Sequence, residues 1–317
     1  MNSYLKKISA CPDSTHPSQI LPFPEMSEKR IYQVAVTGST GQLGKELALI
    51  TDEHPDFAFI FLSRQEFPLD DPERMKSWLD QNPVDIFIHT AAYTAVDKAE
   101  SEKEKAFLIN ASACGMIASL LSKKNSRLIY ISTDYVFDGT SSRPLTELAQ
   151  TNPVNWYGST KLEGERLVME NNRNSLVIRT SWVYSAFGNN FVKTMMRLMK
   201  GGPSVRVVND QIGSPTYAGD LAGAIVHILE SEHFVPGIFH YCNEGQASWF
   251  NFATEIKELS GIPCDVIAIP SSGFPTPAKR PAYSLMDNSK IKKVYGLSIP
   301  EWKTSLALCI QKINEGV

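Results

Sequence analysis

Three glycines that follow a short apolar run constrain the fold of this chain more than any other feature. The run at residues 31–37 ends at Gly38, and Gly41 and Gly44 follow at intervals of three before the helix-like segment 45–50. Glycines at this spacing let the backbone turn tightly and bring amide groups at a helix N-terminus close to a diphosphate. The pattern therefore predicts a strand, a diphosphate-binding turn and a helix.

Strands and helices are expected to alternate through the first 180 residues. Apolar runs predict strands at 57–62, 84–89, 127–131 and 175–180, and the intervening segments predict helices at 72–81, 97–124 and 156–171. This alternation predicts an α/β fold with a Rossmann-type doubly wound parallel sheet. After residue 180 the pattern is less regular, with helices expected near 189–200, 217–231 and 248–260 and a strand near 205–208.

We therefore expect three segments. Residues 1–30 hold several prolines among polar residues and are expected to form a loosely ordered extension. Residues 31–180 are expected to form an NAD(P)-binding domain, to which some later segments return. Residues 181–317 are expected to form mainly a smaller C-terminal α/β lobe that binds substrate at the carboxyl edge of the sheet.

Composition excludes several classes of function. A net charge of -3 provides no basic field for nucleic acid, and no apolar run approaches the ~18 to 20 residues that cross a bilayer. The five cysteines are scattered and odd in number, which is typical of reduced thiols in a cytoplasmic protein. The histidines lack a ligand-type spacing, so we expect no catalytic metal. The sequence does not reveal the oligomeric state, and it leaves a homodimer open.

Tyr157 and Lys161 are the first candidates for catalysis. They lie four residues apart in a predicted helix, so their side chains should project from one face. An adjacent ammonium favours phenolate, and we expect Lys161 to lower the pKa of Tyr157 into a range useful for proton exchange. Thr133 follows the strand expected at 127–131 and carries a hydroxyl that could hydrogen-bond a substrate carbonyl or the phenol.

The end of the strand at 57–62 bears on the choice of cofactor. An acidic residue there would bind the ribose 2'-hydroxyl of NADH, but this chain has Ser63 and Arg64. A guanidinium suits a 2'-phosphate, so NADPH is the expected cofactor, with NADH as a second one that the site could accept. The small residues after the strand at 84–89, including Ala91 and Ala92, would let the backbone pass close to a cofactor ribose.

Aromatic and basic side chains supply candidates for substrate binding. Tyr135, Phe137 and Trp182 could stack on a sugar or a base, with Trp182 the first choice. Arg280 could bind the substrate diphosphate through its guanidinium, although a surface salt bridge explains it equally well.

Several segments together resemble one protein family. They are Thr37 to Gly44, AAYTAVDKAE at 91–100, STDYVFDG at 132–139, YGSTKL at 157–162, RTSWVY at 179–184, NNFVKTM at 189–195, VNDQIGSPT at 208–216 and PTPAKRPAYS at 275–284. The chain resembles the extended short-chain dehydrogenases/reductases, and within them the branch that reduces 4-keto nucleotide sugars in rhamnose synthesis. The resemblance spans about residues 32 to 312. It implies that NAD(P)H reduces the C4 keto group of dTDP-4-dehydro-L-rhamnose.

The resemblance also implies roles for individual residues. Tyr157 would protonate the developing alkoxide, Lys161 would hold the nicotinamide ribose, and Thr133 would orient the carbonyl. It implies cofactor contacts at Gly38, Thr40, Gly41, Gln42, Leu43, Ser63, Arg64, Leu69, Ala91, Ala92, Tyr93 and Thr94. It implies substrate contacts at Val96, Asp134, Tyr135, Trp182 and Arg280, besides Thr133.

The chain departs from the family pattern at two places. Many relatives have an aspartate in the adenine loop, where this chain has Pro68 followed by Leu69. Some relatives dimerise through a magnesium ion held by three glutamates; Glu46 matches one, but Gly202 and Lys312 lie near the other two positions, so we expect no bridging metal. Two alternative functions remain: a nucleotide-sugar epimerase or dehydratase, and a non-catalytic regulatory subunit like that of methionine adenosyltransferase.

Overall fold

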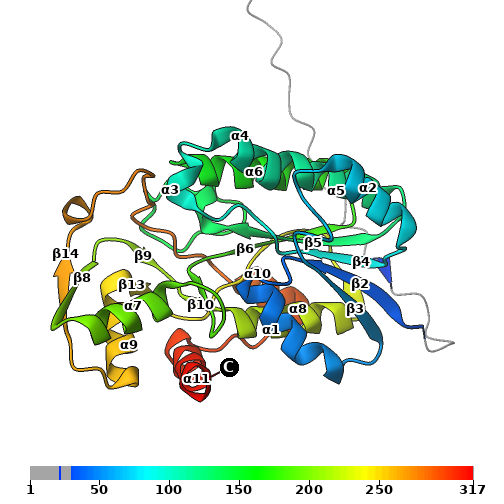
Figure 1. The fold of residues 1–317 in the computed structure, drawn as a ribbon. Helices are drawn as coiled ribbons and strands as arrows, with labels where there is room; N and C mark the ends of the chain where they lie inside the picture. Colours follow the sequence, from blue (N-terminus) through cyan, green and yellow to red (C-terminus); the bar gives the residue numbers. More distant parts are fainter. Residues whose placement is uncertain (1–20, 23–29, 317) are drawn as a thin grey trace, which may run out of the picture.

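The computed structural model describes residues 21–22 and 30–316. Six parallel strands form its central sheet: β2 (Tyr32–Thr37), β3 (Phe57–Leu62), β4 (Ile86–His89), β5 (Arg127–Thr133), β6 (Ser175–Thr180) and β12 (Gly237–His240). Their order across the sheet is β12-β6-β5-β4-β2-β3 (Figure 1). The chain runs from β2 to one edge and then crosses to β4 on the other side of β2. Open α/β sheets place their ligands at such a switch point, and the predicted doubly wound fold is confirmed.

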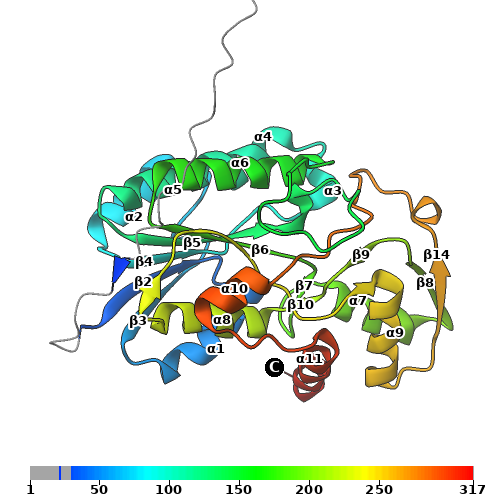
Figure 2. The ribbon, with the colours of Figure 1, turned by 180° about the vertical axis from the view of Figure 1, so that it is seen from behind.

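Helices cover both faces of the sheet. On one face lie α1 (Gln42–Ile50), α8 (Ala218–Glu230) and α10 (Ser289–Tyr295). On the other lie α2 (Pro72–Gln81), α5 (Ala113–Ser122) and α6 (Trp156–Asn171), with α3 (Val96–Ala99) and α4 (Lys103–Phe107) beside them (Figures 1 and 2). Because both faces are covered, the strands are apolar on both sides, as Val36 and Phe87 illustrate with no exposed surface.

Local signals set the ends of several helices. Asp71 accepts a hydrogen bond from the backbone N–H of Arg74 at 3.1 Å, and Pro72 occupies the first helical position of α2. Asn155 caps α6 in the same way, accepting from Gly158 N–H at 2.8 Å. The predicted boundaries of both helices agree with the structure.

The single helix predicted over 97–124 is wrong in detail. The helix stops after α3, where the Glu100 carboxylate accepts from Trp156 N–H and Ser101 Oγ donates to the carbonyl of Lys98. It resumes at α4, widens into a π-helical turn at Leu108–Ser112 and continues as α5. By length and composition the 20-residue stretch Lys103–Ser122 is apolar enough to cross a membrane, contrary to our expectation, but half of its most apolar window is buried in the fold.

The remaining segments form a lobe beside the carboxyl edge of the sheet. Its helices are α7 (Phe191–Gly201), α9 (Trp249–Ser260) and α11 (Trp302–Glu315). Its short strand pairs are β7 (Val183–Tyr184) with β10 (Thr216–Tyr217), β8 (Ser204–Val208) with β14 (Asp265–Ile269), and β9 (Ile212–Gly213) with β13 (Ala247–Ser248). Tyr184, Phe252 and Trp302 lie in its apolar core. Short 3-10 turns occur at Thr51–Glu53, Asp134–Val136 and Ser271–Gly273.

The chain passes between the two parts more than once. After its first passage through the lobe it returns to the sheet as α8 and β12, and it returns again as α10 before ending in α11. The segment boundaries proposed from the sequence stay predictions. Most of residues 1–30 lie outside the described part, but β1 (Leu21–Pro22) pairs antiparallel with β11 (His233–Phe234), which the expected loose extension did not anticipate.

Glu46 ties the lobe to the cofactor-side helix α1. Its buried carboxylate accepts hydrogen bonds from Ser185 Oγ at 2.6 Å and from the Tyr217 hydroxyl at 3.2 Å, and lies 3.6 Å from Lys312 Nζ. Within residues 21–22 and 30–316, no group of three or more His, Cys, Asp or Glu side chains is arranged to hold a metal ion. The four described cysteines, Cys114, Cys242, Cys264 and Cys309, are free and buried.

Candidate active site

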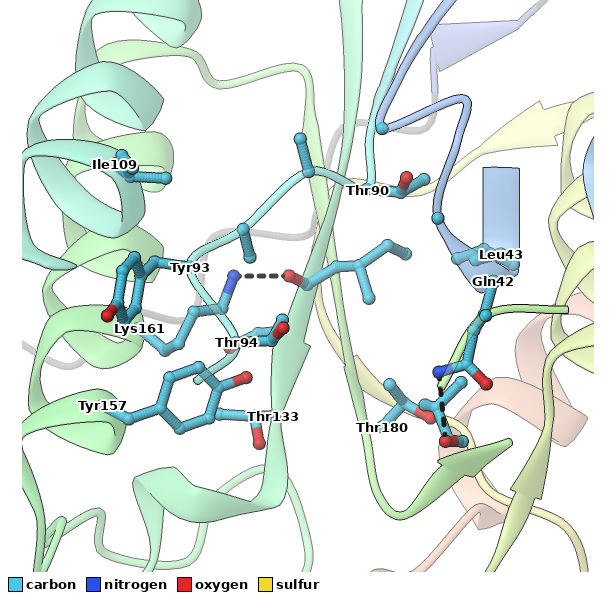
Figure 3. Close-up of a pocket in the computed structure, with 18 of the residues that line it drawn as sticks. Gln42, Leu43, Thr90, Tyr93, Thr94, Ile109, Thr133, Tyr157, Lys161 and Thr180 are labelled. Carbon is cyan, nitrogen blue, oxygen red and sulfur yellow. Dashed lines mark hydrogen bonds between the residues drawn. The ribbon is translucent and has the colours of Figure 1, made fainter. Parts of the chain in front are cut away.

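A cavity of about 680 Å³ opens at the carboxyl edge of the sheet, between the strand ends and the lobe (Figure 3). Its walls are the glycine loop after β2, the loops after β3, β4 and β5, the first turns of α6, and the lobe segment after β6. The candidate site residues named from the sequence line it, except Arg280 and Phe137. The structure therefore brings together side chains separated by up to about half the chain.

The glycine loop forms a cradle for a diphosphate. Gly38 has a φ of +75°, and a Cβ there would lie 2.6 Å from Thr90 Oγ1 and 2.9 Å from the backbone N of Ala91. A Cβ on Gly44 would lie 2.3 Å from the carbonyl oxygen of Gly38. Gly41 precedes the first residue of α1 without a side-chain cap, so the first-turn amides face the cavity unshielded. This arrangement fits the diphosphate of a dinucleotide.

Gln42 links the glycine loop to the lobe. Its Nε2 donates to the carbonyl oxygen of Val183 at 3.4 Å, as Figure 3 shows, and its Oε1 accepts from Asn190 Nδ2 at 2.9 Å. Thr40, Leu43, Val183 and Asn189 line the same part of the cavity. Gln42 therefore bridges the glycine loop and the lobe, as Glu46 does from the same helix.

The loop after β4 is held by Asn110. The side chain of Asn110 accepts from Tyr93 N–H at 2.8 Å and donates to the carbonyl of Tyr93 at 3.1 Å and to Thr160 Oγ1 at 3.1 Å. Its own carbonyl oxygen, in the π-helical turn, accepts from the Tyr130 hydroxyl at 3.2 Å. Asn110 therefore positions Tyr93 and its neighbours Ala91, Ala92 and Thr94 along the cavity wall.

Charged and polar groups cluster at the end of β3. Ser63, Arg64, Leu69 and Asp70 line this end of the cavity, and Arg64 Nη2 lies 2.7 Å from Asp70 Oδ2. The backbone N–H of Ser63 donates to Glu66 Oε2 at 2.7 Å. The pair between Arg64 and Asp70 is well exposed to solvent, with 71% and 40% of the two side chains accessible.

Tyr157 projects from the first turn of α6 toward Thr133 at the end of β5 (Figure 3). Burial raises the pKa of Tyr157 well above its usual value, the charges of Asp134 and Tyr135 raise it further, and a hydrogen bond with Thr133 opposes the shift. Our expectation that Lys161 lowers this pKa is wrong in the structure. Tyr157 is consequently a protonated phenol at neutral pH, the form that donates a proton.

Lys161 is anchored beneath the cavity. Its Nζ donates to the carbonyl oxygen of Ile131 at 2.7 Å (Figure 3) and lies 4.0 Å from the ring centroid of Tyr130. Burial lowers the pKa of Lys161 to about 8, and the nearby Cys114 and Glu165 oppose that shift. The ammonium is therefore held by a carbonyl oxygen and an aromatic face.

Asp134 places a second ionisable group beside Thr133. Thr133 Oγ1 donates to Asp134 Oδ1 at 3.1 Å, while Asp134 Oδ2 is buried without a hydrogen-bond partner among the described residues. Burial raises the pKa of Asp134 to about 6, against hydrogen bonds from Ser284 and Thr133. Asp134 lines the cavity, but its unpartnered oxygen is buried below the cavity surface.

Aromatic side chains form another part of the cavity wall. Trp182 has a φ of +48°, which is rare for a bulky residue, and its ring fills the space that a Cβ on Gly213 would need. The ring stacks on Trp249 at a centroid distance of 3.6 Å and an interplanar angle of 8°. Val96 and Tyr135 complete this wall, whereas Phe137 packs in the core against His240 instead.

Arg280 lies outside the cavity lining. Its guanidinium forms two hydrogen bonds with Asp97, at 2.5 Å to Oδ1 and 2.8 Å to Oδ2. These bonds lower the pKa of Asp97, the side-chain bond from Arg280 being the largest cause. The salt-bridge interpretation of Arg280 thus describes its position in the structure better than the diphosphate contact does.

The cavity also contains residues that our sequence reasoning did not select. They are Phe67, Asp70, Thr90, Lys105, Ile109, Ile131, Ser132, Thr180, Val183, Gly188, Asn189 and Leu221. Thr90, Ser132 and Thr180 stand at or next to the carboxyl ends of strands, a rule that could have identified them. Lys105 and Leu221 lie on helices that reach the cavity only through tertiary packing, and nothing in their local sequence indicates this.

Comparison with known proteins agrees with this geometry. The family model described as the RmlD substrate binding domain matches residues 32–315. A dTDP-4-dehydrorhamnose reductase of Burkholderia thailandensis is 36% identical over 300 residues, covering 89% of this chain and 99% of that protein. The reductase of the same name from Escherichia coli is 35% identical over 291 residues, covering 88% and 97%.

Solved structures give the same picture. The dTDP-4-dehydrorhamnose reductase of Bacillus anthracis in complex with NADP has a TM-score of 0.85 and 34% identity, with 89% of this chain and 99% of that chain covered. The UDP-glucose 4-epimerase of Thermus thermophilus, at 18% identity and a TM-score of 0.75 over 90% and 100% of the two chains, shares the fold alone. Since one family model spans almost the whole described chain and relatives above 30% identity match nearly their full length, the chain belongs to the RmlD substrate binding domain family.

Proposed function

We propose that this chain is a dTDP-4-dehydrorhamnose reductase, which uses NADPH to reduce the C4 keto group of dTDP-4-dehydro-L-rhamnose and so makes dTDP-L-rhamnose. One observation carries the proposal: a protonated phenol, Tyr157, lies beside the Thr133 hydroxyl in the cavity that the glycine cradle also lines. A reduction needs a proton donor next to the carbonyl, and this pair supplies it. The relatives of that name match over nearly their entire length.

The residues present fit a nicotinamide dinucleotide. When bound, NADPH supplies the hydride that is added at C4. The amides at the start of α1 would bind its diphosphate, the Ala91 to Thr94 loop would lie along a ribose, and Ser63 with Arg64 would face the adenosine end. Lys161, fixed by Ile131 and Tyr130, would present its remaining N–H groups to the nicotinamide ribose.

The chain's own groups then handle the carbonyl. The Thr133 hydroxyl would orient the carbonyl oxygen, and Tyr157 would donate its proton to that oxygen as charge develops. Asp134 would position the Thr133 hydroxyl, whose hydrogen it accepts, and Trp182 with Val96 would lie against the sugar ring. We assign no direct substrate contact to Arg280, which would act through Asp97 next to Val96.

We place the enzyme in solution in the cytoplasm, with a nucleotide sugar as its small-molecule partner. The net charge of -3 supports the absence of a nucleic-acid partner, and the burial of half of the apolar helix window supports a core rather than a membrane location for that helix.

The test is the loss of NADPH absorbance in the presence of dTDP-4-dehydro-L-rhamnose generated in situ. The wild type should oxidise NADPH with this sugar. Tyr157→Phe keeps the ring but removes the phenolic proton, so its kcat should be about 10²- to 10⁴-fold lower. A parallel assay with NADH measures cofactor preference. Turnover by the variant at the wild-type rate would remove Tyr157 as the proton donor.

Tyr32→Phe is a matched control, because it removes a phenol hydroxyl from the start of β2, outside the cavity lining. Its kcat should equal that of the wild type. A wild type that binds NADPH but does not consume it with this sugar would contradict the proposed substrate.

A further inference from the structure

At the adenosine end of the cavity, two carboxylates each occupy one hydrogen-bond donor of a residue that would contact a cofactor. Asp70 Oδ2 lies 2.7 Å from Arg64 Nη2, and Glu66 Oε2 accepts the backbone N–H of Ser63 at 2.7 Å. Ser63, Arg64 and Asp70 all line the cavity. They follow β3, the position from which dinucleotide-binding folds contact the adenosine ribose.

Both carboxylates are ionised at neutral pH. The hydrogen bond from Arg64 is the largest cause that lowers the pKa of Asp70, and the backbone N–H of Ser63 is the largest cause that lowers the pKa of Glu66. Lys105, which also lines the cavity, adds a weaker favourable charge for Asp70. Charges of both signs therefore meet at this end of the cavity: Arg64, Lys105 and Asp70 line it, and Glu66 is bonded to the backbone of Ser63.

NADPH and NADH differ at this place by one phosphate. The 2'-phosphate carries a charge of about -1.5 to -2, by analogy with other phosphate monoesters at neutral pH. To bond Arg64 Nη2 or the backbone N–H of Ser63 it must compete with the two carboxylates, and it lies close to their negative charges. The 2'-hydroxyl of NADH meets no such repulsion, and it can donate a hydrogen bond to a carboxylate.

We propose that Asp70 and Glu66 are specificity-determining residues that weaken the discrimination of this enzyme in favour of NADPH. Arg64 attracts the 2'-phosphate, and the two carboxylates oppose it by competing for the same donors and by repelling the added charge. The balance lets both reduced dinucleotides serve at one site. This inference rests on the proposed function only in that it requires a nicotinamide dinucleotide to bind with its adenosine end at β3.

The experiment measures binding rather than turnover. Dissociation constants for NADP⁺ and NAD⁺ are determined by titration calorimetry for the wild type, Asp70→Asn, Glu66→Gln and the double variant. We expect NADP⁺ to bind about fivefold more tightly in each single variant and about tenfold or more in the double variant, since exposed charges interact modestly. NAD⁺ should change by less than about twofold, and the gain for NADP⁺ should shrink at high salt.

Asp80→Asn is the matched control, because it removes one negative charge from α2 outside the cavity lining, where Asp80 pairs with Lys76 at 2.6 Å. It should leave both dissociation constants unchanged. Arg64→Gln is made in the wild-type and in the Asp70→Asn background, and NADP⁺ affinity is measured for each. A gain from Asp70→Asn that persists without Arg64 is due to direct repulsion, and one that disappears is due to competition for the guanidinium; both effects belong to the proposal.

NADP⁺ affinity that stays the same or falls in both neutral variants would overturn the inference, and so would an equal gain for NAD⁺. Those results would mean that the two carboxylates stabilise the loop or the position of Arg64 and do not set cofactor specificity. A wild type that binds neither dinucleotide would instead count against the proposed function, so the two failures are distinguishable.

Discussion

The two halves of the cavity are built in different ways. The cofactor half consists of loops that follow β2, β3 and β4 of one parallel sheet, and glycine backbone forms the part that would hold the diphosphate. The substrate half depends on Trp182, whose ring is held by Trp249 and by the bare backbone of Gly213. The glycine loop of the cofactor half has no room for an added side-chain atom. The shape of the substrate half, in contrast, can be changed by substituting residues that pack behind its lining.

The largest expected effect is in the backbone half. Gly44→Ala puts a Cβ 2.3 Å from the Gly38 carbonyl oxygen, so the loop must move. We expect unfolding free energy to fall by about 3 kcal/mol and NADPH binding to be lost, measured by denaturant unfolding and calorimetry. Gly223→Ala, in α8 where no neighbouring atom of residues 21–22 and 30–316 lies within 4 Å of the added Cβ, should instead stabilise by about 0.5–1 kcal/mol. Similar behaviour of the two variants would contradict the cradle.

The side-chain half should respond more selectively. Trp249→Leu removes the ring on which Trp182 stacks, and we expect the KM for the keto sugar to rise about tenfold, since such pairs contribute ~0.5–1.5 kcal/mol. The KM for NADPH should stay within twofold. Steady-state kinetics with each substrate varied gives the answer, and Trp249→Phe should recover part of the loss. An equal rise in both KM values would remove the distinction between the halves.

Asp134 lies where the halves meet and gives a pH test. Its folded-state pKa of about 6 is above its ordinary value of 3.8, so the folded state holds the proton more tightly, and stability is lost as pH rises through that window. Asp134→Asn should therefore stabilise the fold by about 2 kcal/mol at pH 8 and by almost nothing at pH 3.5, while lowering activity. Thermal unfolding at the two pH values measures this, and a pH-independent gain would rule out the buried charge as its cause.

Arg280 should give the smallest effect. Because its guanidinium is bonded to Asp97 outside the cavity lining, Arg280→Met should change the KM for the sugar by less than about threefold and stability by about 1 kcal/mol or less. Kinetics and unfolding of the single variant suffice. A KM raised tenfold or more would return Arg280 to the substrate half, as a diphosphate contact.

The backbone half was the more predictable from sequence. Strand ends, the glycine spacing and the caps at Asp71 and Asn155 are local signals, and the elements at 72–81, 156–171 and 175–180 agree with the structure. The helix predicted at 97–124 was wrong because Glu100 bonds to Trp156, a contact 56 residues away that the local pattern does not contain.

The electrostatics of the site were less predictable. Helical spacing correctly indicated that Tyr157 and Lys161 line one cavity, but it does not say where an ammonium points. In the structure Lys161 bonds to Ile131, and burial therefore dominates the pKa of Tyr157. The stack of Trp182 on Trp249 and the pairing of Arg280 with Asp97 likewise join distant segments, which a single sequence does not reveal.

The position of β12 at the edge of the sheet has a consequence for how the chain is made. Its partner β6 ends at Thr180, but β12 begins only at Gly237, after the first passage through the lobe and after α8. During synthesis on a ribosome, β6 therefore emerges before β12, and the backbone groups on that edge of β6 stay unpaired until β12 is made. Ribosome pausing between these two strands would prolong exposure of that edge, so the speed of translation across the first lobe passage bears on the yield of native enzyme.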